Sequence, residues 1–161
     1  MRHAIFLPTV ILLVLQSLAL PPEADAQQGW GGPGVGLILG EPTGLSLKTS
    51  LRARGSLDAA AAWSFEGNGY LHLHGDLLFH NWNAANLRVE DGRLGFYYGI
   101  GARAVFRNND PWLGLRVPLG ISYLISNSPL ELFGELAPIL DLTPNSTFRV
   151  NGGLGLRYWL N

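Results

Sequence analysis

A strict two-residue alternation between apolar and polar side chains is the feature that most constrains how this chain folds. It is clearest in the stretch LHLHGDLLFH, residues 71–80. One parity of this stretch is ionisable (His72, His74, Asp76, His80), and the other is apolar (Leu71, Leu73, Leu77, Phe79). Because successive side chains of a β-strand point to opposite faces, the stretch predicts a strand with one apolar and one ionisable face.

The same alternation recurs along most of the chain. It is broken at short intervals by Gly, Pro, Asn and Asp, which is typical of strands joined in hairpins. We predict eight strands, at residues 34–40, 44–52, 57–65, 70–80, 94–107, 112–125, 130–140 and 148–160. The longest connection runs from Asn81 to Arg93. Pro118 and Pro138 fall inside predicted strands, and since proline has no backbone N–H, we expect a bulge or a local gap at both.

The two faces of these strands differ in a way that favours a barrel with its apolar face outside and its polar face inside. The apolar parity carries no charged residue in any strand, whereas the polar parity carries the strand charges and many glycines. A solvent-facing parity has no need of so many glycines, because glycine weakens strands. A narrow eight-stranded barrel does need them, since bulky inner side chains such as Tyr97, Phe133 and Trp159 must lie over small neighbours.

Aromatic residues of the apolar parity cluster at the strand ends, while the middle of each strand is mostly aliphatic. If the strands run up and down, one rim holds Trp63, Phe65, Phe106 and Phe148, and the other holds Phe79, Phe96, Tyr98, Tyr123 and Tyr158. Two aromatic girdles around an aliphatic band are typical of a transmembrane β-barrel. The predicted fold is therefore all-β, an eight-stranded antiparallel up-and-down transmembrane barrel, closed because lipid does not tolerate unpaired strand edges.

The first 26 residues predict a cleaved secretory signal peptide. A basic start is followed by an apolar run from Ala4 to Leu20 and by the small-x-small sequence at residues 24–26. The competing interpretation is an uncleaved membrane anchor, which Pro8 inside the run disfavours. We expect residues 27–161 to form a single domain, in which basic and acidic residues balance. That balance argues against a nucleic-acid binder, and the absence of cysteine excludes a lipoprotein anchor.

Five segments carry a resemblance to a known family: residues 36–48 (GLILGEPTGLSLK), 97–103 (YYGIGAR), 113–124 (LGLRVPLGISYL), 137–144 (APILDLTP) and 153–159 (GLGLRYW). They resemble small outer-membrane β-barrel proteins of Gram-negative bacteria, which are similar in architecture to the eight-stranded membrane domains of the OmpA and OmpX type. The resemblance implies an outer-membrane location, contact with outer-membrane lipid and recognition by the barrel-assembly machinery. It supplies no catalytic residues. Such proteins tend to end on an aromatic residue, whereas this chain ends Trp159-Leu160-Asn161.

The ionisable parity of residues 72–80 allows two interpretations. His72 and His74 lie two residues apart, about 6.5–7 Å along a strand, so they can ligate one metal ion with Asp76, or with a group from a neighbouring strand, as third ligand. Alternatively, they line a hydrated lumen. We expect the second, without metal or cofactor, because residues of both signs share this inner parity (Asp76, Arg103, Arg116, Glu131, Glu135). Arg116 is expected to pair with Glu135 or Glu131, since their strands are adjacent.

No catalytic constellation accompanies these residues. Ser64 and Ser122 lie on the inner parity, and no residue next to either can act as a base, so we expect no enzyme. Eight strands leave little or no aqueous channel, which disfavours a pore. The expected function is that of an outer-membrane barrel with a structural, envelope-integrity or surface-binding role, with any protein partner left open. The alternative is a secreted, soluble, lipocalin-like barrel that binds a small ligand, or a metal through His72 and His74.

Overall fold

The computed structural model describes residues 32–41, 43–51, 55–64, 70–82, 91–107 and 110–160. Within them the chain is all-β, and its strands form one antiparallel sheet. The strands are β1 (Gly34–Glu41), β2 (Gly44–Ser50), β3 (Gly55–Ser64), β4 (Tyr70–Asn81), β5 (Gly92–Arg107), β6 (Asp110–Arg116), β7 (Leu119–Ile125), β8 (Leu130–Thr143) and β9 (Thr147–Trp159). The described part of the chain contains no helix long and apolar enough to cross a membrane.

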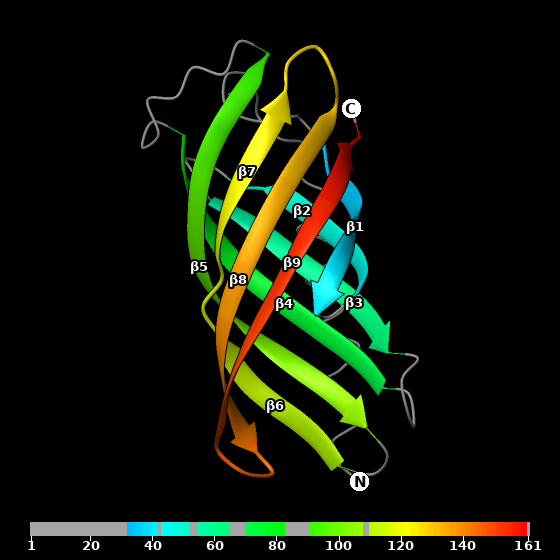
Figure 1. The fold of residues 1–161 in the computed structure, drawn as a ribbon, viewed down its shortest axis with the longest axis vertical. Helices are drawn as coiled ribbons and strands as arrows, with labels where there is room; N and C mark the ends of the chain where they lie inside the picture. Colours follow the sequence, from blue (N-terminus) through cyan, green and yellow to red (C-terminus); the bar gives the residue numbers. More distant parts are fainter. Residues whose placement is uncertain are drawn as a thin grey trace, which may run out of the picture.

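The sheet closes in a ring, because the first and last strands pair with each other. Gly34 lies opposite Trp159 and Glu41 opposite Gly152. From β1 to β6 consecutive strands pair with each other, as do β7, β8 and β9, whereas β6 pairs with β8 in place of β7. β6 and β7 both pair with β5, β6 beside residues 101–107 and β7 beside residues 92–98, so together they occupy one position in the ring. The predicted all-β antiparallel barrel is therefore confirmed as a fold, although the described chain has nine strands where eight were predicted, because the strand predicted at residues 112–125 is divided into β6 and β7. Figure 1 shows the elongated barrel, with the C-terminus and the β7–β8 turn at its upper end and the β8–β9 turn at its lower end.

The break between β6 and β7 occurs at Val117 and Pro118, where a gap was expected. Pro118 accepts a hydrogen bond from the Gly99 N–H at 2.9 Å but has no N–H to return. The expectation for Pro138 is met by a local gap on one side of β8, although β8 itself runs through this residue. The pairing with β6 ends at Ile139 and the pairing with β7 begins at Leu136, so Pro138 has no register partner there. In an antiparallel strand the N–H and C=O of one residue point to the same neighbour. The Pro138 carbonyl accepts from the Val117 N–H at 3.0 Å, so its missing donor also faces the interrupted strand, and the β8–β9 ladder continues.

The alternation of side chains places the apolar parity outside the barrel. Every strand contributes exposed large apolar residues, among them Leu37 on β1, Leu73 on β4 and Leu154 on β9. The inner parity is buried and polar: Lys48, Asp58, His72, Asp76, His80, Arg103, Arg116, Ser122, Glu131, Asp141 and Arg157 are all buried. The interior of this barrel therefore contains many ion pairs and hydrogen bonds, beside buried apolar side chains such as Leu78 and Ile139.

Bulky inner side chains lie over glycines, as the sequence predicts. A Cβ added to Gly155 would overlap the ring of Phe133, and one added to Gly120 would overlap the ring of Tyr97. Both rings are buried in the lumen. These glycines are needed because two side chains cannot occupy the same level of so narrow a barrel.

The aromatic residues of the two predicted rims lie on the outer surface. Seven of them are exposed, namely Trp63, Phe106 and Phe148 of one rim and Phe79, Phe96, Tyr98 and Tyr158 of the other, while Tyr123 is half-buried. The rings of Phe79 and Tyr98 are neighbours, with centroids 5.8 Å apart. Phe65, the predicted signal peptide at residues 1–26 and most of the connection from Asn81 to Arg93 lie outside the described residues.

Candidate functional site

The candidate site is the polar lumen, which runs along the barrel as three groups of side chains. We call them upper, central and lower because Glu131 lies near the β7–β8 turn and Asp141 near the β8–β9 turn, which are the upper and lower ends of the barrel in Figure 1. The upper cluster consists of Ser46, Lys48, Asp58, Ser122, Glu131, Arg157 and Trp159. The central cluster consists of His74, Asp76, Tyr97, Arg116 and Glu135. The lower cluster consists of Arg103, Trp112, Asp141 and Arg149.

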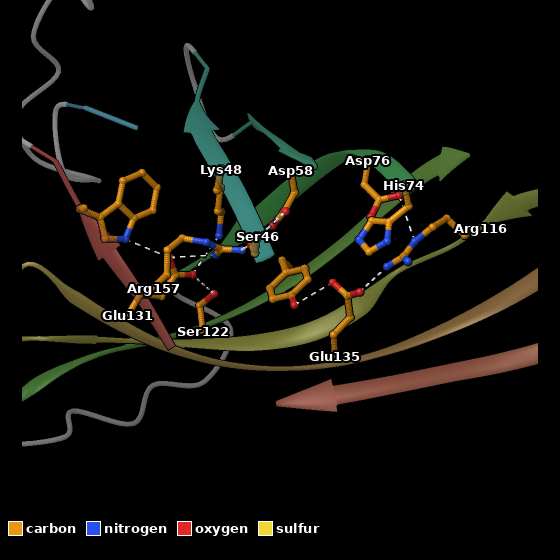
Figure 2. A network of polar contacts seen from close by, with 12 residues as sticks. Ser46, Lys48, Asp58, His74, Asp76, Arg116, Ser122, Glu131, Glu135 and Arg157 are labelled. Carbon is orange, nitrogen blue, oxygen red and sulfur yellow. Dashed lines mark hydrogen bonds and ion pairs between the residues drawn. The ribbon is translucent and has the colours of Figure 1, made fainter. Parts of the chain in front are cut away.

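Glu131 on β8 is the centre of the upper cluster. One carboxylate oxygen accepts from Lys48 Nζ at 2.9 Å and from the Ser122 hydroxyl at 2.6 Å. The other accepts from Arg157 Nη1 at 3.2 Å and from the Trp159 indole N–H at 3.0 Å. The Glu131 residue is 0 % exposed. Four donors from three other strands therefore converge on one carboxylate that water does not reach (Figure 2).

Asp58 on β3 is the second carboxylate of the upper cluster. It accepts from Arg157 Nη2 at 2.7 Å, and the same nitrogen donates to the Ser46 hydroxyl at 2.6 Å. The Arg157 guanidinium also lies 4.3 Å from the centre of the Phe133 ring. The cluster thus balances two cations, Lys48 and Arg157, with two carboxylates.

Arg116 organises the central cluster. Its Nε lies 3.0 Å from Asp76 Oδ1, and its Nη2 donates to Glu135 Oε1. Glu135 also accepts from the Tyr97 hydroxyl at 3.0 Å. The predicted pairing of Arg116 with Glu135 is thus present, whereas Glu131 pairs with Lys48 and Arg157 instead. Two carboxylates share a single cation in this cluster.

The lower cluster closes the opposite end of the lumen. Arg103 donates to both oxygens of Asp141, at 2.6–3.0 Å, and Arg149 Nε lies 3.2 Å from Asp141 Oδ2. The Arg149 guanidinium also stacks on the Trp112 ring, 4.6 Å from its centre. At the upper mouth, Arg93 makes a similar contact with Trp82, at 5.4 Å. A cation–π pair therefore stands at each end of the polar lumen.

The histidines that the sequence singles out all face the lumen. His72 and His74 have ring centroids 5.5 Å apart in an edge-to-face arrangement, and His74 Nε2 lies 3.9 Å from Asp76 Oδ2. His80 lies farther along β4, with its ring stacked on that of Trp82 and beside that of Tyr97. Among the residues described, no three His, Cys, Asp or Glu side chains are grouped so that they could hold a metal ion.

Several lumen residues were missed by the sequence reasoning. Asp141 was assigned to a turn because it precedes Thr143 and Pro144, yet β8 extends to Thr143 and keeps Asp141 on the inner parity. Its alternation with Glu131 and Glu135 was the available signal. Trp82 and Trp112 also have the inner parity of the neighbouring strands. Both lie next to turns, and the sequence analysis did not assign them to the lumen.

The chemistry that this arrangement supports is charge pairing. The Ser46 hydroxyl donates to Asp58 and that of Ser122 to Glu131, so within the described chain each serves a carboxylate and neither has a histidine base. No family model matches the chain, and searches of curated proteins and of solved structures gave no match. The family resemblance in the sequence therefore stays a prediction.

Proposed function

We propose that this chain is an integral outer-membrane β-barrel with a structural or envelope-integrity role and a plugged, non-conducting lumen. The observation that carries the proposal is the reversed placement of side chains, with large apolar residues outside on every strand and the charges buried inside. A water-soluble protein rarely exposes a continuous apolar surface of this extent. Lipid is the solvent in which such a surface is favourable, and a closed barrel leaves no strand edge unpaired in it.

The height of the apolar surface supports this proposal. On β9 the outward residues run from Phe148 to Tyr158, ten residues later. At about 3.4 Å per residue and a strand tilt of about 40°, this distance corresponds to roughly 26 Å along the barrel axis. Transmembrane barrels carry an apolar band about 25 Å tall between aromatic girdles. The aromatic residues at the two ends of this span fit the positions of such girdles.

The packed lumen favours a structural role over a transport role. Ion pairs occupy it at three successive levels, and Tyr97, Phe133 and Trp159 are buried among them. The polar interior thus connects strands that are not neighbours in the sheet. One example is the ion pair of Lys48 on β2 with Glu131 on β8. Surface binding through the loops remains part of the proposal, with a protein partner of undetermined kind.

The soluble alternative requires the leucine parity to turn inward around a ligand cavity. Among the described residues most large apolar side chains of that parity are exposed, which does not favour the apolar ligand cavity of a lipocalin-like barrel. Binding of a metal through His72 and His74 is disfavoured by the lack of a third ligand among the described residues.

Refolding tests the proposal directly. Residues 27–161 are refolded with and without detergent micelles, followed by far-ultraviolet circular dichroism and by gels run with and without boiling. A β-rich spectrum that forms only in micelles, together with a band that shifts on boiling, is the expected result. A monodisperse β-rich protein in plain buffer would contradict it. Fractionation of Gram-negative cells that express the whole chain then tests the location.

A further inference from the structure

A small cavity lies in the lumen where the upper and central clusters meet. Its volume is about 20 Å³. The side chains of Asp58, His74, Arg116, Glu135 and Asn151 line it, and glycines of β9 border it. None of the ion pairs described above is formed across it between the two clusters. Figure 2 shows His74, Arg116 and Glu135 grouped together beside the upper cluster.

Two features indicate what this cavity can bind. Nδ1 of His74 is buried and has no hydrogen-bond partner in the described chain. A neutral imidazole that directs its Nε2–H toward Asp76 leaves Nδ1 as an acceptor. In addition, Asp76 and Glu135 share one cation, Arg116, so the central cluster has more acceptor than donor capacity. A ligand here must therefore donate at least two hydrogen bonds.

We infer that the cavity is a specific site for one water molecule. A cavity needs roughly 10–15 Å³ to hold a water molecule, and that molecule needs two to four polar partners. This cavity meets both requirements and is too small for a larger ligand. The water donates to His74 Nδ1 and to the Glu135 carboxylate, and Asn151 or Arg116 donates to its oxygen. It completes the hydrogen bonding of the central cluster on the side that faces the upper cluster, whether or not the barrel lies in a membrane.

Diffraction at a resolution that resolves ordered solvent tests this site. In the wild-type barrel we expect a single solvent peak within hydrogen-bond distance of His74 Nδ1 and of a carboxylate. Replacing His74→Leu removes the acceptor, and the peak should be lost. His72→Leu is the matched control, because His72 is buried on the same strand face with an unpartnered Nε2, yet does not line the cavity. That variant should keep the peak.

Absence of the wild-type peak would overturn the inference, and so would a peak that His74→Leu leaves at full height. The wild-type measurement stands by itself if either variant fails to fold. It is also independent of the proposed function, since detergent-dependent refolding and the solvent peak are separate observations.

Discussion

Replacing Glu131→Leu should destabilise the barrel more than any other single change of a lumen carboxylate. Glu131 accepts hydrogen bonds from Lys48, Ser122, Arg157 and Trp159, and it is fully buried. After the change, Arg157 keeps Asp58 at 2.7 Å, but Lys48 loses the carboxylate with which it pairs. Removing one partner of a buried ion pair costs about 3–5 kcal/mol, because the remaining charge stays buried without compensation.

The second variant of this experiment removes both charges, as Lys48→Met together with Glu131→Leu. Arg157 and Asp58 then still balance each other, and no buried charge is left alone. Replacing a buried ion pair by apolar residues of similar volume is often neutral or stabilising. We therefore expect the double variant to recover about 0.5–3 kcal/mol relative to Glu131→Leu, the usual range of coupling energies for residues in contact.

The assay is equilibrium unfolding in urea of the barrel refolded in micelles, followed by tryptophan fluorescence. Five tryptophans supply the signal. The free energies of unfolding of the wild type, both single variants and the double variant complete a double-mutant cycle. A loss below about 1 kcal/mol for Glu131→Leu would refute the reasoning, given the scale for buried pairs. So would a double variant less stable than Glu131→Leu.

Three further predictions concern the lumen, the glycines and the outer surface. Arg116→Met should lower the temperature at which the folded band is lost on gels, because it leaves two carboxylates without a cation; an unchanged temperature would argue against the central ion pairs. Gly155→Leu should abolish the folded band, since its side chain would overlap an aromatic ring of β8, whereas Gly75→Ala should be tolerated because the nearest atom lies 4.0 Å from the new Cβ. In urea unfolding from lipid vesicles, Leu154→Arg should lower the free energy of unfolding by about 2–4 kcal/mol and Leu160→Arg by about 0–1 kcal/mol. The reason is that Leu154 lies within the apolar span of β9 and Leu160 beyond its end. Equal losses for the two variants would count against membrane insertion.

The barrel and its inside-out placement of side chains could be predicted because a period of two is visible locally. The strand limits agree within a few residues, as for β4, predicted at residues 70–80 and found at Tyr70–Asn81. The gap at Pro118 followed from its missing N–H. The gap at Pro138 falls only on the side of β6 and β7, because its effect depends on which neighbouring strand the missing donor faces. That direction is a property of the pairing between strands, which a single segment does not contain.

The pairing inside the lumen was only partly predictable for the same reason. Adjacent strands suggested that Arg116 pairs with Glu135, and it does. The contact between Lys48 and Glu131 joins β2 to β8 across the lumen, so nothing in the sequence neighbourhood of either residue indicates it. Inner side chains at the same height meet whether or not their strands are neighbours. Their height depends on the register of every intervening strand pair.

The division between an apolar exterior and a charged interior implies that the surroundings of this barrel decide its stability. Burial of apolar surface is the dominant favourable term in the folding of soluble proteins. Here the large apolar side chains lie outside, where water gives no such gain and lipid does. The buried charges supply little net stability, because their desolvation offsets their attraction. They select one arrangement instead, since a shifted register would leave Glu131 or Arg157 buried without a partner. Lipid around the strands would thus determine the stability of the barrel, and the ion pairs within the lumen would determine the register of its strands.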